Sequence, residues 1–261
     1  MFERFVFDGI SCDEYGIMCV TFSSSTMDTI SAQQTNLETE KSIRGNIYHI
    51  TSQEYSEPLT YTMQVVNRDF SPISAIQERA LKKWLCQRNK YKLFCVLEKR
   101  YADIWFYANI NNPKSIYVAD TVGLEFTITT NAPFGFSDIR DKKWIMDGND
   151  FIEDFYVDND EEIPIYPDLT IAMVDSGTLT LVNQSVMDVP NTLTIDNCVT
   201  GEVITLECGY PFISSSITTH NVFDDFNKYW PYLIDGYNRI TVNKPCTLEF
   251  KYREYRKVGM V

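Results

Sequence analysis

Histidine is nearly absent from this 261-residue sequence, which has only His49 and His220. A catalytic histidine needs an orienting partner and a nucleophile, and neither stands beside these two in the sequence. There is also no glycine-rich phosphate loop, and nothing singles out a catalytic pair among the 36 acidic residues. The sequence therefore predicts a protein that is not an enzyme and that uses no cofactor.

Paired cysteines are lacking as well. The seven cysteines are odd in number and form no C-x-x-C motif, and several lie among apolar residues, as Cys95 does. Such thiols behave as small apolar side chains, so we expect them to be reduced. The chain is then expected to fold in a reducing cytosol.

Long apolar runs and an excess of basic residues are also missing. No apolar run approaches the ~20 residues of a membrane-spanning helix, and residues 1–9 lack the basic region of a signal peptide. The 36 acidic and 23 basic residues give a formal net charge of −13. Because nucleic-acid binding relies on lysine and arginine to neutralise phosphates, we expect no specific nucleic-acid binding and no membrane insertion.

Aromatic residues, in contrast, are abundant, with 16 tyrosines and 16 phenylalanines. Aromatic and β-branched side chains pack well on strands, and apolar and polar residues alternate with period two in many segments. The sequence therefore predicts a mainly β protein. The expected strands include residues 46–55, 59–65, 91–97, 103–110, 122–129, 178–182, 192–195, 203–206 and 247–253.

One segment, residues 74–89, has helical periodicity. Ser74 and Gln77 fit a capping box at its start, and Asn89 is a plausible end. We expect this helix to pack on a β-sandwich, with Trp84 anchoring the helix to the sheet. The predicted apolar stripe consists of Ile76, Ala80, Leu81, Trp84 and Leu85.

Composition changes near the middle of the chain. Residues 132–137 end the last strand of the first half, and residues 147–162 contain eight acids and no base. We expect two domains, 1–138 and 139–261, with 147–162 as a solvated acidic connecting segment. The spacing of its acids does not fit a calcium-binding loop, so no metal site is predicted. The short strands and frequent turns that follow predict a jelly-roll-like or lectin-like β-sandwich.

Tyr229, Trp230 and Tyr232 form the densest aromatic group of the second half. Exposed rings can stack on sugars, whereas core packing accounts for the same residues. These three are therefore the candidate saccharide contacts of an alternative hypothesis, a carbohydrate-binding adhesin or accessory module for host-cell attachment. Saccharide binding by the second half would distinguish it. A carboxylate-based glycosidase is a third hypothesis, testable by glycan turnover.

Several segments, in order along nearly the whole chain, resemble the distal tail proteins of long-tailed phages. Residues 5–9, the helix with Trp84 and residues 132–137 are similar to the N-terminal domain of that family. Residues 230–240 and 250–253 are similar to its C-terminal domain. Each segment is short, and the resemblance comes from their common order along the chain.

The resemblance implies a structural protein of the virion, located in the tail tip or baseplate after assembly in the host cytoplasm. Its first domain, a β-sandwich with one packed helix, would form a homo-hexameric ring around the DNA channel. The tail-tube protein would bind one face of the ring and the tail-tip hub, or tail-associated protein, the other. The second, galectin-like domain would point outward and hold receptor-binding proteins. An acidic channel wall would let DNA pass without sticking.

Overall fold

The chain divides into two compact units. The computed structural model describes residues 3–22, 35–43, 45–101, 103–148 and 154–258. The first unit comprises Met1–Phe136 and Lys257–Val261, and the second comprises Ser137–Arg256. The chain thus enters the second unit once and returns to the first near its end. The sequence predicts one boundary at about residue 138, and the roles expected of the two domains stay predictions.

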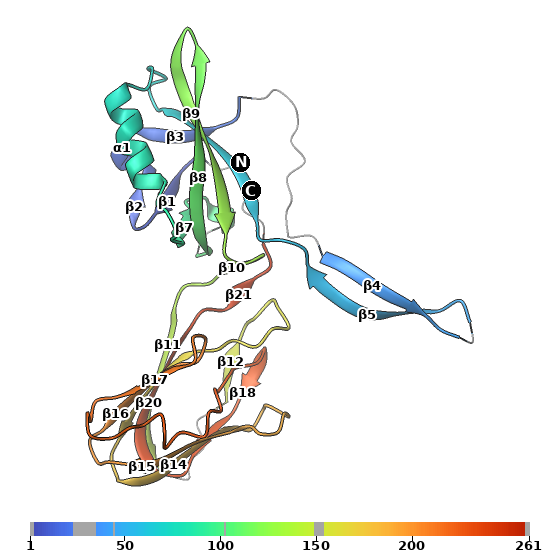
Figure 1. Cartoon of the computed structure of the whole chain (residues 1–261), viewed down its shortest axis with the longest axis vertical. Helices are drawn as coiled ribbons and strands as arrows, with labels where there is room; N and C mark the ends of the chain where they lie inside the picture. Colours follow the sequence, from blue (N-terminus) through green and yellow to red (C-terminus); the bar gives the residue numbers. More distant parts are fainter. Residues whose placement is uncertain (1–2, 23–34, 44, 102, 149–153, 259–261) are drawn as a thin grey trace. The chain divides into compact units, whose positions relative to one another are not determined.

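The first unit is built on an antiparallel sheet with one α-helix beside it (Figure 1). The strands of this sheet follow the order β2-β1-β7-β8-β9-β6-β3, and β10 pairs with β8. In the described part of the chain, β4 and β5 form a separate two-stranded sheet. The elements are β1 (Phe5–Phe7), β2 (Ile10–Ser11), a 3-10 helix (Cys12–Tyr15), β3 (Ile17–Val20), β4 (Thr35–Lys41), β5 (Tyr48–Tyr55), β6 (Thr60–Asn67), α1 (Ala75–Leu85), β7 (Lys92–Val96), a 3-10 helix (Lys99–Tyr101), β8 (Trp105–Val118), β9 (Asp120–Thr130) and β10 (Gly135–Phe136).

Alternating apolar residues give this sheet its buried face. Leu124, Phe126 and Ile128 of β9 are all fully buried, and Phe126 is paired with Met63 of β6. They belong to one core that also includes side chains of β1, β3, β7, β8 and α1. The predicted strands over residues 59–65 and 122–129 are therefore confirmed, as is the mainly β fold.

Gly135 lies in the segment 132–137, which contributes to the family resemblance, and the structure shows why this position requires glycine. A Cβ atom at this position would lie 2.6 Å from Cγ2 of Ile104. Only glycine therefore lets β10 approach β8 closely enough for Phe136 to pair with Trp105.

The predicted helix exists but is shorter than expected. Its N-cap is Ser74, whose hydroxyl accepts a hydrogen bond from the Gln77 amide over 3.2 Å. The helix ends at Leu85, four residues before the predicted end at Asn89. No helix of the described chain is long and apolar enough to cross a membrane.

The buried face of α1 consists of Leu81, Trp84 and Leu85. The prediction that Ile76 shares this face is wrong, because Ile76 is 85% exposed. Successive residues of a helix are turned by about 100°, so a residue five positions before Leu81 lies about 140° away around the axis. Ile76 therefore belongs to the opposite face.

Trp84 fixes α1 to the start of the chain. Its side chain is 5% exposed and stacks on Tyr15 with ring centroids 4.4 Å apart, and on Phe5 at 5.8 Å. The indole N–H donates a hydrogen bond to the carbonyl oxygen of Phe7 over 3.3 Å. A large apolar ring is thus buried with its one polar group satisfied.

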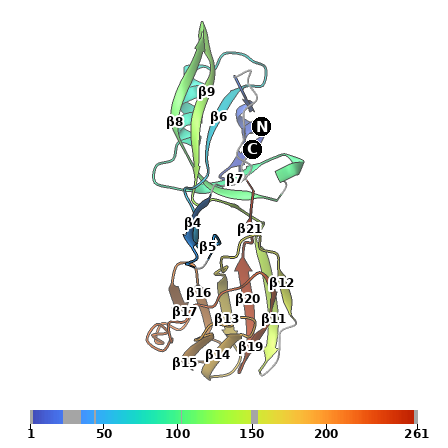
Figure 2. The same cartoon turned by 90° about the vertical axis from the view of Figure 1, so that its right-hand side faces the viewer.

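The second unit is a β-sandwich (Figure 2). A five-stranded sheet, β11-β20-β13-β16-β17, and a three-stranded sheet, β15-β14-β19, contribute side chains to a single core, and β12 pairs with β18. The elements are β11 (Arg140–Asp147), β12 (Phe155–Val157), β13 (Asp168–Met173), β14 (Gly177–Asn183), β15 (Thr192–Cys198), β16 (Val203–Glu207), β17 (Phe212–Ser215), β18 (Gly236–Asn238), β19 (Ile240–Val242), β20 (Pro245–Tyr252) and β21 (Tyr255–Arg256).

The acidic segment 147–162 lies within the second unit and does not connect the two units. Five of its six described acids are exposed, as expected of a solvated segment: Asp147, Asp154, Asp158, Asp160 and Glu162. Phe155 and Val157 of β12 are buried in the core, and Glu161 is also buried. The alternation of Phe155 and Val157 is typical of a strand. This pattern is short and surrounded by acids, so it is hard to recognise in the sequence. Asp150 and Glu153 lie outside the described residues.

Replacement of Trp84 by alanine should destabilise the first unit. The change removes buried aromatic surface and leaves a cavity, which typically costs about 3–5 kcal/mol out of a domain stability of ~5–15 kcal/mol. Urea unfolding of the full-length protein, followed by fluorescence and circular dichroism, measures the loss. The matched control is Ile76→Ala on the exposed face of the same helix, with an expected change within about 0.5 kcal/mol. Equal effects of the two substitutions would contradict the role given to Trp84.

Candidate functional site

The three aromatic residues proposed as saccharide contacts do not form one exposed surface. Tyr229 and Trp230 pack against the core of the second unit, and the Trp230 ring lies edge-on to Phe226 at 4.9 Å. The Tyr229 hydroxyl is buried without a hydrogen-bond partner among the described residues. The Tyr232 hydroxyl donates to Asp188, and burial together with this hydrogen bond raises the pKa of Tyr232. Saccharide contact by these rings stays a prediction.

The two histidines have different surroundings. His49 lies on the exposed strand β5, whereas the His220 side chain is buried in the second unit. His220 Nδ1 lies 2.6 Å from Glu202 Oε1, and its Nε2 lies 3.1 Å from Asp225 Oδ2. Although burial lowers the pKa of His220, the two carboxylates outweigh this effect and raise it. The geometry therefore suits an imidazolium that donates from both nitrogens.

Glu202 is fully buried and its charge is satisfied from several directions. The Ser215 hydroxyl and the Val199 amide both donate to its carboxylate, the latter over 2.8 Å. Burial raises the pKa of Glu202, but these donors and His220 outweigh it, so the pKa is lowered. In a Ser–His–acid triad the hydroxyl donates to the imidazole. Here Ser215 donates to the glutamate, so this cluster is a structural ion pair.

The acids of segment 147–162 are distributed over the structure instead of gathering around one point. Asp154 accepts two hydrogen bonds of 2.5 Å from Arg239, which lower the pKa of its carboxyl. Asp158 and Asp160 lie 3.4 and 3.9 Å from Arg256. No group of three or more His, Cys, Asp or Glu residues in the described ranges is arranged to hold a metal ion.

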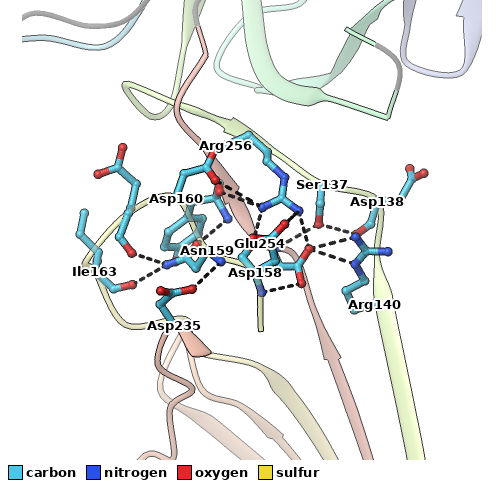
Figure 3. Close-up of polar contacts among 12 residues, drawn as sticks. Ser137, Asp138, Arg140, Asp158, Asn159, Asp160, Ile163, Asp235, Glu254 and Arg256 are labelled. Carbon is cyan, nitrogen blue, oxygen red and sulfur yellow. Dashed lines mark hydrogen bonds and ion pairs between the residues drawn. The ribbon is translucent and has the colours of Figure 1, made fainter. Parts of the chain in front are cut away.

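A polar network joins the residues at which the chain enters and leaves the second unit (Figure 3). At its centre is Glu254, which is 3% exposed. Arg140 Nε donates to one carboxylate oxygen over 3.0 Å and Arg256 over 2.7 Å, and the Asp158 amide donates to the other over 3.2 Å. A buried carboxylate is tolerated when its charge is paired and its oxygens accept hydrogen bonds. Glu254 meets both conditions.

Ser137 holds the same junction through both its main chain and its hydroxyl. The Glu254 amide donates to Ser137 Oγ over 3.0 Å, and the Ser137 amide donates to the Glu254 carbonyl over 2.8 Å. Arg253 also donates to the Ser137 carbonyl over 2.6 Å. β11 and β20 then pair in continuous register from Arg140 with Tyr252 onward. The strand that follows the entry point and the strand that precedes the exit are thus neighbours in the five-stranded sheet.

Asn159 holds the loop beside this junction. Its Nδ2 donates to the carbonyl oxygens of Glu161 and Ile163 over 2.6 and 3.1 Å. Its side-chain Oδ1 accepts from the main-chain amide of Tyr255 over 2.8 Å. The main-chain amide of Asn159 donates to the Asp235 carboxylate over 2.9 Å. Figure 3 shows this side chain between the loop and the strand that leaves the unit. Asn159, through its side chain and main chain together, thus connects the loop at 161–163, the strand at Tyr255 and the segment at Asp235.

Glu254, Asn159 and Glu202 carry many polar contacts of the second unit but are not predicted from the sequence. A signal for Glu254 exists in the alternation of β20. Every second residue from Cys246 to Tyr252 is buried, and Glu254 is the next position of that series. No comparable signal marks Asn159, because main-chain groups can accept from or donate to any polar side chain, and so the residue types of its partners do not reveal these contacts.

The β4–β5 hairpin is the most exposed element of the first unit. All residues of β4 are exposed, and β5 is exposed except at Ser52 and Tyr55. Its base is held where the Tyr55 ring lies edge-on to Phe134 at 6.3 Å. In Figure 1 the hairpin extends away from the sheet. An isolated two-stranded hairpin is marginally stable in water, so this element is suited to contact another molecule.

Two family models match consecutive parts of the sequence. The model described as "Phage tail protein N-terminal domain" matches residues 1–132, and that described as "Phage tail C-terminal domain" matches residues 134–252. The chain belongs to this family of phage tail proteins. A relative from Bacillus subtilis (strain 168), "SPbeta prophage-derived uncharacterized protein YomH", is 22% identical to this phage tail protein over 255 residues, 96% of each chain.

Two solved structures share the fold. One is the "Crystal Structure of SPP1 Dit (gp 19.1) Protein, a Paradigm of Hub Adsorption Apparatus in Gram-positive Infecting Phages". Its TM-score is 0.65 at 9% identity, over 97% of this chain and 99% of that one. The other is a chain of the "Phage P2 Baseplate in its Activated Conformation with Ca", with a TM-score of 0.54 at 7% identity, covering 97% and 98%. The predicted resemblance to distal tail proteins is therefore confirmed in fold.

The stability of the second unit should fall as the pH rises above neutrality. The folded pKa of His220 is raised above its unfolded value of about 6.5. Its stabilising contribution is therefore fully present below about pH 6.5 and is lost as the pH rises through the folded pKa. Urea unfolding of the full-length protein between pH 6 and 9 measures this dependence.

The His220→Gln variant should be less stable at pH 6 and should lose this part of the pH dependence. Its neutral amide cannot compensate the buried charge of Glu202. The His49→Gln variant is the matched control, because His49 is exposed on β5, and it should keep the wild-type profile. Parallel wild-type and His220→Gln profiles would show that His220 does not titrate as described.

Proposed function

We propose that this phage tail protein is the ring-forming hub of the tail tip, assembled as a homo-hexamer around the DNA channel. One face of the ring binds the tail-tube protein and the other binds the tail-tip hub or tail-associated protein. The second unit points outward and holds receptor-binding proteins. The observation that carries the proposal is the fold match, over 97% of this chain, to the SPP1 protein that is called a paradigm of hub adsorption apparatus.

The properties of the site support a structural role. Buried ionisable groups such as Glu254 and Glu202 are paired within the second unit, and their hydrogen-bonding capacity is used by protein donors. An active site keeps such groups available for a substrate. A family of phage tail structural proteins likewise suggests a non-enzymatic function and a place in the virion.

The state of the cysteines supports assembly in the host cytoplasm. All seven are free thiols, and six of them are buried. Burial raises the pKa of Cys198 and of Cys246 to about 11 in each case, which keeps these groups protonated and unreactive at neutral pH. A fold that does not depend on disulfides suits a reducing compartment.

The hypothesis of a carbohydrate-binding adhesin gains little from the geometry. Of its three candidate residues, Tyr229 and Trp230 pack against the core, which leaves Tyr232 as the most available ring. Tyr166 lies beside Tyr232 with ring centroids 5.8 Å apart. Two neighbouring tyrosines are the remaining basis for that alternative.

The purified full-length protein should assemble into a closed ring. Head-to-tail contacts between identical subunits either close into rings or extend into filaments, and a hub around a channel requires closure. Light scattering combined with negative-stain electron microscopy should give annular particles of about six times the 30.3 kDa chain mass. A protein that stays monomeric at every concentration and salt, and after addition of tail-tube or tail-tip hub protein, would rule out the ring.

A further inference from the structure

The outer face of the five-stranded sheet in the second unit carries aromatic and acidic side chains at one end. Exposed and buried residues alternate at the start of β13, where Tyr166 and Asp168 are exposed. Asp168 pairs with Glu207 of β16, and Glu207 pairs with Phe212 of β17 (Figure 2). Residues paired directly across an antiparallel sheet point to the same side. Asp168, Glu207 and Phe212 therefore form one row on the outer face.

Exposed rings flank this row. Tyr210, Phe212 and Tyr166 are 85%, 53% and 45% exposed. Gly209, which precedes Tyr210, lies beside Tyr166, and the Cβ atom that it lacks would be 3.9 Å from the Cβ of Tyr166. No side chain at position 209 thus covers Tyr166. Large exposed rings gathered on one surface are typical of sites of protein contact.

Tyr166 is held in place by its neighbours. Its ring lies beside that of Tyr232, with centroids 5.8 Å apart. The Tyr232 hydroxyl in turn donates to Asp188. A ring that is already fixed loses little conformational entropy when a partner binds to it.

The two carboxylates of the row face each other without a base between them. Asp168 and Glu207 form no ion pair within the described residues. Lys251 lies opposite Asp168 on β20, but it is already the ion-pair partner of Glu249 and Asp141. Burial and the charge of Glu207 raise the pKa of Asp168, an effect that Lys251 only partly offsets.

This negative charge is not compensated by the unit as a whole. Ser137–Arg256 contains 21 acidic and nine basic residues, and so carries nearly all of the net charge of −13. Like charges directly opposite each other on a sheet are destabilising. A lysine or arginine from another molecule would relieve this repulsion.

We propose that Tyr166, Asp168, Glu207, Tyr210 and Phe212 form a docking surface for a basic segment of a different tail protein. A lysine or arginine of that segment pairs with the two carboxylates, and apolar side chains beside it cover the rings. Arginine can also stack on the tyrosines. This inference rests on the proposed function, in which the second unit holds other proteins, and it identifies the surface and the charge of the partner.

Charge decides between this partner and two others. A neutral saccharide could stack on the rings, but it would leave the repulsion between Asp168 and Glu207 uncompensated. The second unit of another copy would bring 21 further acids to this surface. A basic protein segment is the partner that satisfies both the rings and the carboxylates.

Photocrosslinking in intact phage particles tests the surface. Photoreactive benzoylphenylalanine replaces Tyr210 in the full-length protein. The matched control has the same replacement at Tyr237, which is 65% exposed on β18 of the same unit. After irradiation, the Tyr210 position should cross-link to a different virion protein, whereas the Tyr237 position should not give this product. Mass spectrometry should place the cross-link in a segment that contains lysine or arginine.

Neutral substitution of the two carboxylates tests the role of charge. In particles with the photoreactive group at position 210, Asp168→Asn/Glu207→Gln should lower the yield of the cross-link at least about tenfold. Because the change removes a like-charge pair, the melting temperature of the full-length protein should not fall, as circular dichroism would show. The control Glu162→Gln/Asp175→Asn neutralises two other exposed acids of the second unit and should keep the yield.

The outcomes separate this surface from the proposed ring. No cross-link from position 210, a cross-link to another copy of this chain, or a yield that is independent of Asp168 and Glu207 would overturn the docking surface while leaving the ring in place. Binding of host cell-wall polysaccharide to the purified full-length protein, with loss in Tyr166→Ala, would assign the rings to a saccharide instead. Particles without a tail-tip ring of this chain would contradict the proposed function, and this inference with it.

Discussion

The buried carboxylate of Glu254 is the interaction on which the second unit depends most. It receives hydrogen bonds from Arg140, near the point where the chain enters the unit, and from Arg256, where the chain leaves it. Ser137 reinforces the same junction, because its hydroxyl accepts from the Glu254 amide and its own main-chain amide donates to the Glu254 carbonyl. Because β11 and β20 pair beside this network, the sandwich is closed where its chain enters and leaves. Both ends of the second unit are therefore held by hydrogen bonds, although the unit is inserted between two segments of the first unit.

The polar chemistry of this phage tail protein serves its architecture. Glu202 and His220 neutralise one another in the sandwich, and Glu254 and Asn159 hold its junction. Each of these side chains is held by hydrogen bonds from other groups of the second unit. Exposed apolar side chains lie in both units, among them Tyr48 and Ile50 of the β4–β5 hairpin and Met187 and Val189 of the second unit.

Local patterns in the sequence predict the elements of this fold better than the polar contacts between them. Alternation over residues 122–129 predicts β9, and Ser74 predicts the start of α1, because both signals are local. The prediction that Ile76 lies on the buried stripe of α1 is wrong because a spacing of five residues turns it by about 140° from Leu81 around the helix axis. The acids of 147–162 favour a connecting segment, and the short strand with buried Phe155 and Val157 is hard to recognise among them. Asn159 is not predicted because its side chain contacts main-chain groups, which leave no mark in the residue types of its partners.

The position of this protein in the virion tests the central claim most directly. Antibody fragments against the exposed surface of the second unit, imaged on intact phage particles by electron cryo-microscopy, would show where the chain resides and how many copies surround the tail axis. The account predicts six labels in one ring at the junction of the tail tube and the tail tip. Labels along the tail shaft, on the capsid, or only as single copies on peripheral fibres would contradict it.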